Sequence, residues 1–312
     1  MIEGERSNTI STPVIIIVGP TSSGKTSLAI SLAKKYDGEV ISADSRQVYK
    51  GLNIGTGKVT TAETEGIPHH LLDIVDAEET YTADTFVRDA TRAITISAEQ
   101  GKVPIIAGGT GFYIDALLGR ITLGAAPADP SLRAELSKIS TDALLSILQE
   151  CNPKRADAIV QKHETQNRVR IIRAIEIARN TGEKSVVHAS SNNPLLSPLW
   201  IGISHTREAL RERINQRLRE RINEGMFKEI EQLHEQGLSW ERMHELGLEY
   251  RYGSQYVRGE LTLDEVETIL QNKIWQYARR QMTYWKRNTD IHWFPLSRQE
   301  DIDTTVRTFL EH

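Results

Sequence analysis

The chain has 312 residues, of which 39% are hydrophobic and 26% charged, and its net charge is −4. This composition excludes whole-chain disorder and a strongly basic nucleic-acid coat protein, but it is compatible with a local basic surface. A single cysteine excludes a disulfide framework and any multi-cysteine metal site. The longest strongly apolar run, Val14–Val18, is far shorter than the ~18 residues that a membrane helix needs. We therefore expect a cytoplasmic protein that crosses no membrane, and we also expect a monomer.

Strand and helix patterns alternate in the first part of the chain. The β-branched run Val14–Val18 and the runs at 39–42 and 103–107 have the composition of buried parallel strands. A helical pattern follows the first run, and another covers 82–100. Strands that alternate with helices are typical of an α/β fold with a parallel sheet.

The pattern becomes purely helical at about residue 125. Helices are expected over 132–139, 141–149 and 166–179, between proline-containing linkers at 125–130 and 191–198. Strand composition returns at 199–203. We therefore predict one domain from 1–124 and 199–312, interrupted by an inserted all-helical domain at 125–198.

The C-terminal third is predicted to be helical. Apolar residues recur every four positions from Leu210 to Ile230, which indicates one apolar stripe. A capping box, Thr262 with Glu265, begins a further helix.

A glycine-rich loop directly follows the first strand and matches G-x-x-x-x-G-K-[ST] in full. Its residues are Gly19, Pro20, Thr21, Ser22, Ser23, Gly24, Lys25 and Thr26. In this strand–loop–helix context, backbone N–H groups and the helix N-terminus bind phosphate oxygens, Lys25 neutralises their charge, and Thr26 is a candidate Mg²⁺ ligand. The loop therefore predicts a site for a diphosphate or triphosphate, in a P-loop NTPase-like parallel sheet with helices on both faces.

The usual Mg²⁺-binding aspartate of nucleotide hydrolases and kinases is missing from its expected place. The strand at 103–107 ends in Gly108–Gly111, and Asp73 after Leu71-Leu72 is a weak substitute. This departure argues against an ordinary ATPase.

Two other strand ends carry candidate chemistry. Asp44 follows the strand at 39–42, and Thr110 follows the strand at 103–107. The carboxyl ends of parallel strands converge on the ligand crevice, so Asp44 is a candidate base or metal contact and Thr110 offers a hydroxyl to a leaving group. The alternatives are an Asx-turn at Asp44 and a tight turn into a helix at 108–110.

Several strings together resemble the tRNA dimethylallyltransferases, the IPP transferase family, along nearly the whole chain. The strings are G-P-T-S-S-G-K-T (19–26), D-S-R-Q-V-Y-K-G-L-N-I-G-T-G-K (44–58), P-H-H-L-L-D (68–73), G-G-T-G-F-Y (108–113), R-A-I-E (173–176) and A-R-R-Q-M-T-Y-W-K-R (278–287). The zinc finger of eukaryotic members does not occur in the sequence, which favours a bacterial-type enzyme.

The resemblance implies an activity and a set of catalytic residues. The family transfers a dimethylallyl group from dimethylallyl diphosphate to N6 of the adenosine at tRNA position 37, next to the anticodon. By resemblance, Asp44 is the general base, Thr110 lies beside the bridging oxygen of the diphosphate, and Arg217 stabilises that diphosphate. The phosphate loop then holds the prenyl diphosphate with Mg²⁺, and ATP is not hydrolysed.

The resemblance also implies a set of tRNA-binding residues, in the anticodon stem-loop interface and around the flipped base. They are Asp44, Ser45, Arg46, Gln47, Thr110, Arg133, Val169, Arg170, Ile171, Ile172, Arg173, Tyr250, Arg251, Arg280 and Gln281. Charge supports such an interface, because residues 152–184 contain eight Lys/Arg and four Asp/Glu, and 273–287 mixes basic with aromatic residues. The structural alternative is that these arginines form ion pairs or cover a packed core, as Arg213, Arg217 and Arg221 could do beside the apolar stripe.

One position departs from the family pattern. Glu249 stands where members usually have glycine, beside Tyr250 and Arg251.

Three alternative functions also stay open: an adenylate isopentenyltransferase that uses free AMP, ADP or ATP, a P-loop nucleoside kinase, and a non-catalytic RNA-binding or GTPase-like switch. The first would have less need for the helical insertion and the basic C-terminal segment, both of which are present.

Overall fold

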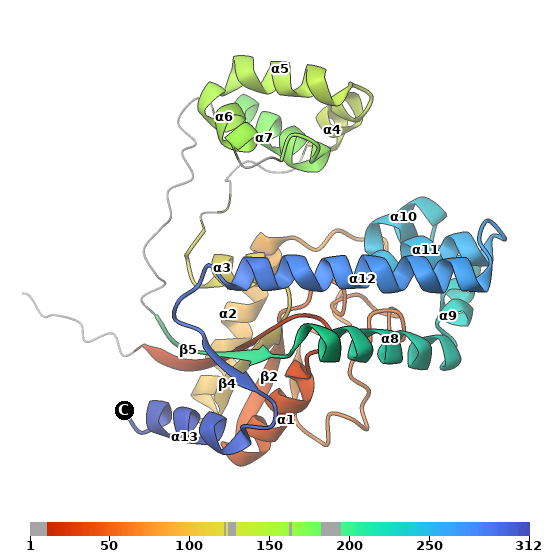
Figure 1. Ribbon diagram of the computed structural model, residues 1–312. Coiled ribbons are helices and arrows are strands. Elements are labelled where there is room, and N and C mark those ends of the chain that lie inside the picture. Colours follow the sequence, from red (N-terminus) through yellow and green to blue (C-terminus); the bar gives the residue numbers. More distant parts are fainter. Residues whose placement is uncertain (1–10, 122, 124–128, 162–163, 182–194) are drawn as a thin grey trace, which may run out of the picture. The chain divides into compact units, whose positions relative to one another are not determined.

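The computed structural model describes residues 11–121, 123, 129–161, 164–181 and 195–312 (Figure 1). The chain divides into two compact units, Met1–Leu118 with Asn192–His312, and Gly119–Ser191. The elements of the first unit are β1 (Thr12–Val18), α1 (Lys25–Lys35), β2 (Gly38–Ser42), β3 (His69–His70), α2 (Ala83–Glu99), β4 (Val103–Gly108), α3 (Gly111–Leu117), β5 (Leu196–Ser204), α8 (Arg207–Asn223), α9 (Met226–Glu235), α10 (Trp240–Leu246), α11 (Leu248–Val257), α12 (Leu263–Trp285), β6 (His292–Pro295) and α13 (Gln299–Leu310). Those of the second unit are α4 (Pro130–Ser137), α5 (Thr141–Cys151), α6 (Pro153–Gln161) and α7 (Arg168–Thr181).

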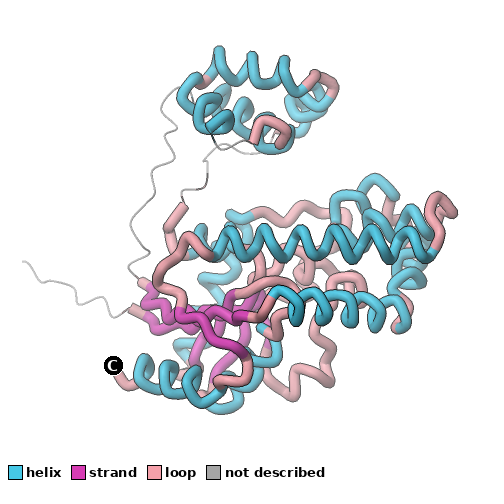
Figure 2. Tube along the Cα trace, in the orientation of Figure 1, coloured by secondary structure: helices cyan, strands magenta, loops and turns pink. Residues whose placement is uncertain are grey.

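The first unit is built on a parallel sheet, shown in magenta in Figure 2. Within the described residues its strand order is β3-β2-β4-β1-β5-β6, and every neighbouring pair is parallel. Strand β1 lies between β4 and β5, with Ile16 opposite both Ile106 and Trp200. The phosphate loop that follows β1 therefore starts near the middle of the sheet's carboxyl edge.

Helices cover both faces of this sheet. Successive side chains of a strand point to opposite faces, so Val14, Ile16 and Val18 pack with residues of α2, α3, α8 and α12, whereas Ile15 and Ile17 pack with α1 and α13. This double burial explains why the strand sequence is apolar without alternation. The predicted α/β fold, a P-loop-like parallel sheet with helices on both faces, is confirmed.

Some expected elements were correct and others were not. The helix predicted at 82–100 is α2, capped by Thr82, and the capping box of Thr262 with Glu265 begins α12. The expectation of an entirely helical C-terminal third was wrong, because β6 adds a strand beside β5. The apolar stripe from Leu210 to Ile230 was predicted as one feature, but it spans two helices, because Gly225 in the left-handed region (φ 103°) separates α8 from α9.

The second unit contains only helices in the part that the structure describes. Its core gathers one side of each helix, including Leu136, Leu144, Ile159 and Ile175. The expected helices at 132–139, 141–149 and 166–179 correspond to α4, α5 and α7, while α6 had not been predicted. Most of the two predicted linkers lies outside the described residues. None of the described helices is both long and apolar enough to cross a membrane.

Candidate functional site

The phosphate loop has the backbone shape of an anion cradle. Ser22 (φ 61°) and Gly24 (φ 96°) both adopt left-handed conformations, which turns successive N–H groups toward one side. Gly24 also forms the N-cap of α1 without a side-chain capping bond, so the first N–H groups of this helix are available to a ligand.

Two serine hydroxyls in this loop lack partners. Ser22 and Ser23 are almost completely buried, and their Oγ atoms make no hydrogen bond within the described residues. Buried hydroxyl groups are normally satisfied, because an unpaired one costs free energy. Both hydroxyl groups are therefore unsatisfied among the described residues, and neither reaches the surface.

Lys25 lies against the same loop. Its Nζ donates hydrogen bonds to the carbonyl oxygens of Pro20 (2.8 Å) and Gly19 (3.2 Å). Burial lowers the pKa of Lys25 to about 8; the negative charge of Asp44 opposes this shift, and the positive charge of Arg217 adds to it. A bound anion would favour the charged form, so Lys25 is suited to respond to a diphosphate.

Asp44 forms the Asx-turn that was the structural alternative for it, and it also lies at the predicted ligand crevice. Its Oδ1 accepts hydrogen bonds from the backbone N–H groups of Arg46 (2.8 Å) and Gln47 (3.4 Å), which is an Asx-turn. Oδ2 has no hydrogen bond to any residue that the structure describes, and Asp44 lines the same cavity as Lys25. One oxygen therefore shapes the turn, and the other is available for chemistry.

The end of β4 closes tightly on this turn. The Thr110 hydroxyl accepts a hydrogen bond from Ser45 N (3.1 Å), and Thr110 N donates to Ala43 O (3.2 Å). A Cβ on Gly108 would come within 2.2 Å of Ala43 O, so only glycine permits this approach. The sequence had suggested that the two strand ends meet, and the structure brings Asp44 and Thr110 into neighbouring turns.

Gln281 joins the phosphate loop to the β4 turn. Its Oε1 accepts a hydrogen bond from Thr21 N (2.8 Å), and its Nε2 donates to Gly109 O (3.0 Å). The side chain is buried. Gln281 was expected to contact tRNA, and its observed contacts are with the two loops that build the site.

Three arginines spaced four residues apart on α8 face these loops, and each has different partners. Arg213 Nε donates to Ser22 O (2.9 Å), so it supports the phosphate loop. Arg221 donates to Gly55 O (2.8 Å) and pairs with Glu249 (3.1 Å). Arg217 lines the cavity, and its guanidinium makes no hydrogen bond or ion pair with the described chain. Desolvation and the nearby charge of Arg221 lower the pKa of Arg217. A bound anion would oppose this shift, because it would favour the charged form of Arg217.

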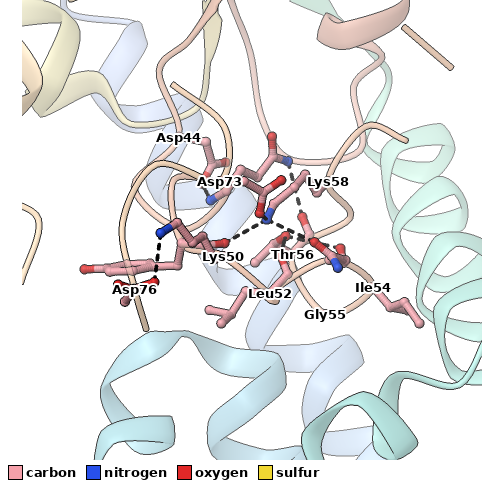
Figure 3. A network of polar contacts seen from close by, with 12 residues as sticks. Asp44, Lys50, Leu52, Ile54, Gly55, Thr56, Lys58, Asp73 and Asp76 are labelled. Atoms are coloured by element: carbon pink, nitrogen blue, oxygen red, sulfur yellow. Dashed lines mark hydrogen bonds and ion pairs between the residues drawn. The ribbon is translucent and has the colours of Figure 1, made fainter. Parts of the chain in front are cut away.

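The loop after β2 is held by a polar network, which Figure 3 shows. The Lys58 ammonium is buried and donates to Tyr49 O (2.7 Å), Asn53 Oδ1 (3.1 Å) and Asp73 Oδ1 (2.5 Å). Asp73, considered from sequence as a substitute metal ligand, is therefore the partner of Lys58. The Gln47 amide donates to Gly57 O (3.2 Å), so the network also ties the Asp44 turn to this loop.

A second carboxylate holds the same loop from α9. Glu229 accepts hydrogen bonds from Asn53 N (3.0 Å), Ile54 N (2.7 Å) and Gly55 N (3.0 Å), and from the Tyr250 hydroxyl (2.8 Å). Tyr250 is buried, with 1% of its surface exposed, so its side chain supports this loop. Arg251 donates to His244 O (2.8 Å). Glu249 in place of glycine neutralises Arg221, a role visible only in the structure.

The phosphate loop, the Asp44 turn and the three arginines of α8 contribute to the lining of one cavity of about 730 Å³. Among the predicted site residues, its lining includes Thr21, Ser22, Ser23, Gly24, Lys25, Thr26, Asp44, Gln47, Arg217 and Gln281. The described residues contain no group of three or more His, Cys, Asp or Glu side chains that could enclose a metal. The oxygen donors of Thr26 and Asp44 nonetheless fit Mg²⁺, which commonly takes only one or two protein ligands together with phosphate oxygens.

The tRNA-binding arginines expected in the second unit all form ion pairs. Arg133 contacts Glu176 through Nε (3.0 Å) and Nη2 (2.8 Å), and Arg173 contacts the same carboxylate (2.5 Å). Arg170 pairs with Glu164 (2.5 Å). Glu176 is completely buried, and although its burial acts in the opposite direction, these hydrogen bonds lower its pKa to about 2.

The stretch Val169–Arg173 does not present one uniform surface. Val169 is 80% exposed, whereas Ile171 lies in the core of the second unit with 0% exposed. Ile172 is half-buried and packs against that core. Only part of this stretch therefore has side chains that an RNA could reach.

Sequence reasoning missed several residues that build the site. Arg213, Lys58 and Glu229 support its loops through backbone contacts, and His205 Nε2 lies 2.8 Å from Ser23 O. The four-residue spacing of Arg213, Arg217 and Arg221 was a usable signal, since it places them on one helix face. Glu229 carried no such signal, because its partners are backbone N–H groups more than 170 residues away.

Comparison with known proteins gives consistent relatives. The family model for IPP transferase matches residues 47–288. A tRNA dimethylallyltransferase 2 of Citrifermentans bemidjiense is 42% identical over 274 residues, covering 88% of this chain and 86% of the relative. A tRNA dimethylallyltransferase 2 of Treponema denticola is 42% identical over 276 residues, covering 88% and 91%.

Solved structures agree with these relatives. The tRNA isopentenylpyrophosphate transferase of Bacillus halodurans has a TM-score of 0.71 at 34% identity, and the match covers 96% of this chain and 97% of that one. A eukaryotic dimethylallyltransferase, described as acting on tRNA, has a TM-score of 0.74 at 25% identity, covering 96% and 77%.

Proposed function

Because the chain belongs to the IPP transferase family, we propose that it transfers a dimethylallyl group from dimethylallyl diphosphate to N6 of the adenosine at tRNA position 37. The observation that carries the proposal is one cavity lined by the phosphate loop, Asp44 and the unpaired Arg217. An anion cradle and a carboxylate with a free oxygen therefore face the same space.

The arrangement supports a balanced transfer step. The adenine amine forms a bond to the first carbon of the prenyl group while the bond from that carbon to the diphosphate oxygen breaks. The electron pair leaves with the diphosphate, where Lys25, Arg217 and the backbone N–H groups of the loop offset the developing charge. The proton of the amine passes to Asp44 Oδ2.

We also propose that Mg²⁺ binds at the site through oxygen ligands. Thr26 would hold it together with the diphosphate, and it would supply further neutralisation of the leaving group. Thr110, whose hydroxyl accepts from Ser45 N, can direct its own proton toward a bridging oxygen.

The RNA partner requires a surface beyond the cavity, because a stacked base must leave its helix to react. We assign this role to the inserted helical region, predicted as 125–198, and to the basic, aromatic segment 273–287. Support comes from the positive count of 152–184 and from exposed side chains such as Val169 and Arg133.

A competition assay tests the proposal. The enzyme is offered dimethylallyl diphosphate with tRNA, AMP, ATP and adenosine in one mixture, and each acceptor is analysed by mass spectrometry. We expect the prenyl group on tRNA alone. Prenylated AMP or ATP would identify an adenylate isopentenyltransferase, phosphorylated nucleoside would identify a kinase, and tRNA binding without product would identify a binding protein.

A further inference from the structure

Tyr277 lines the cavity of the site but makes no hydrogen bond with the described residues that build it. It lies on α12 one turn before Gln281 and therefore on the same face of the helix. Gln281 bridges the phosphate loop and the β4 turn, and Tyr277 lines the same cavity as Asp44.

The ring of Tyr277 is unusually accessible for an aromatic residue of this helix. Tyr277 is 37% exposed, whereas Trp275 and Trp285 are 9% and 1% exposed. Tyr277 belongs to neither hydrophobic cluster of the first unit, and it stacks on no other aromatic ring among the described residues. Core packing therefore does not account for its position.

The surroundings of Tyr277 are polar and charged. The Arg280 guanidinium lies 5.9 Å from the ring centroid. Burial of the phenol oxygen raises the pKa of Tyr277, as does the charge of Asp44, while Arg46 acts in the opposite direction. The phenol therefore stays neutral, and it shares the cavity with Asp44.

We propose that the ring of Tyr277 is the surface on which the acceptor purine stacks beside Asp44. The assignment rests on the proposed function, since it presupposes a base extruded from RNA. An exposed aromatic face next to arginines is the usual support for an unpaired base. Stacking of this kind would hold the exocyclic amine near the free oxygen of Asp44.

The test uses an RNA stem-loop with 2-aminopurine at the target position. Extrusion of the base from the loop raises its fluorescence, and stacking on an aromatic ring quenches it. We expect the RNA bound to Tyr277→Ala to be brighter than the RNA bound to wild type, whereas Tyr277→Phe should match wild type because it keeps the ring. Asn272→Ala, at an exposed position of α12 outside the segment 273–287, is the matched control and should also match wild type.

Kinetics provide a second readout with unmodified tRNA. Loss of one base–aromatic stack is expected to raise KM for tRNA by about 5- to 150-fold in Tyr277→Ala. The KM for dimethylallyl diphosphate and the melting temperature should stay close to wild type, because Tyr277 is outside the core.

Two results would overturn the assignment. One is equal fluorescence of 2-aminopurine RNA bound to Tyr277→Ala and to wild type, and the other is an unchanged KM for tRNA. A failure of the proposed function looks different, because wild-type protein would then prenylate no RNA.

Discussion

At the scale of single residues, the two oxygens of Asp44 differ. Oδ1 holds the turn through Arg46 N and Gln47 N, and Oδ2 is the proton acceptor that we propose. The variant Asp44→Asn keeps an oxygen acceptor for the turn but cannot take a proton. We expect its kcat to fall by about 10²–10⁴-fold, the usual contribution of a general base, with diphosphate affinity retained.

The variant Asp44→Ala is the comparison for this prediction, because it removes both roles. We expect it to lose turnover as well and, in addition, to lower the melting temperature. Near-normal turnover in Asp44→Asn would show that the proton goes elsewhere.

Lys25 makes diphosphate binding dependent on pH. Its pKa is lowered to about 8, so the ammonium is present below pH 8 and is lost as the pH rises through that value. Affinity for inorganic diphosphate should therefore be highest below pH 8 and should fall above it. Calorimetric titration at a series of pH values measures this, with Lys25→Arg as a control that stays charged and should show a flatter profile.

Residue positions could be predicted from sequence only where a motif or a strand end fixes them. The positions of the phosphate loop and of Asp44 were predictable for this reason. The partners of Arg133, Gln281 and Tyr250 were not, because an arginine or an amide has the same sequence signature whether it binds RNA, a carboxylate or a backbone carbonyl. Their hydrogen bonds join residues that are 43, 260 and 21 positions apart.

At the scale of elements, the three arginines of α8 have different contacts. Arg221 is 8% exposed and holds both Glu249 and Gly55 O, so Arg221→Ala leaves a half-buried carboxylate unpaired. We expect it to destabilise the protein by about 3–5 kcal/mol, measured by chemical unfolding.

Arg217→Ala should behave differently, since its guanidinium has no partner within the described chain. We expect no change in unfolding free energy and a loss of about 1.5–3 kcal/mol in the binding of diphosphate. A stability loss in Arg217→Ala equal to that in Arg221→Ala would contradict this division of roles.

The elements themselves were predictable where burial imposes a pattern. Strand β1 is buried on both faces and reads as an uninterrupted β-branched run, and α2 has a cap at Thr82. Strands β3 and β6 were missed because they are short strands at the edges of the sheet, with few fully buried residues. Their pairing depends on neighbouring strands and not on their own composition.

At the scale of the whole molecule, the second unit contains a buried carboxylate, Glu176, that pairs with Arg133 and Arg173. Glu176 has a pKa of about 2 against an ordinary value of 4.5. A carboxyl group whose pKa is lower in the folded state contributes stability above its unfolded pKa and loses it as the pH falls through the folded value. Hydrogen exchange of α7 amides in the full chain, taken relative to the intrinsic rate at each pH, should therefore stay slow at pH 4.5 and accelerate toward pH 2.

The variant Glu176→Gln provides the control for that titration. It should exchange faster at neutral pH, because it leaves Arg133 and Arg173 without their carboxylate, and it should lose the acceleration below pH 4.5. If this variant had the same pH dependence of hydrogen exchange as wild type, Glu176 would not be the group that stabilises α7.

Arg170 and Arg173 form ion pairs within the second unit, so a role in RNA binding has to be tested separately from a role in stability. If Arg170 and Arg173 also bind phosphates, the double alanine variant should reduce the slope of log affinity against log salt by about 0.7 to 0.9 for each arginine–phosphate interaction that it removes. If they serve only Glu164 and Glu176, the melting temperature falls and the salt slope for tRNA stays at the wild-type value. Measuring both on one preparation separates the two roles.

The central claim is that a prenyl diphosphate on the phosphate loop and an adenine amine beside Asp44 react in one cavity. Single-turnover transfer of labelled dimethylallyl diphosphate to two anticodon stem-loops tests it most directly. One loop carries adenosine at the target position, and the other carries purine riboside, which lacks the exocyclic amine. We predict that label enters the adenosine loop without ATP, with release of an equal amount of diphosphate, and that none enters the purine riboside loop. Label in the purine riboside loop, or transfer that requires ATP, would contradict the account.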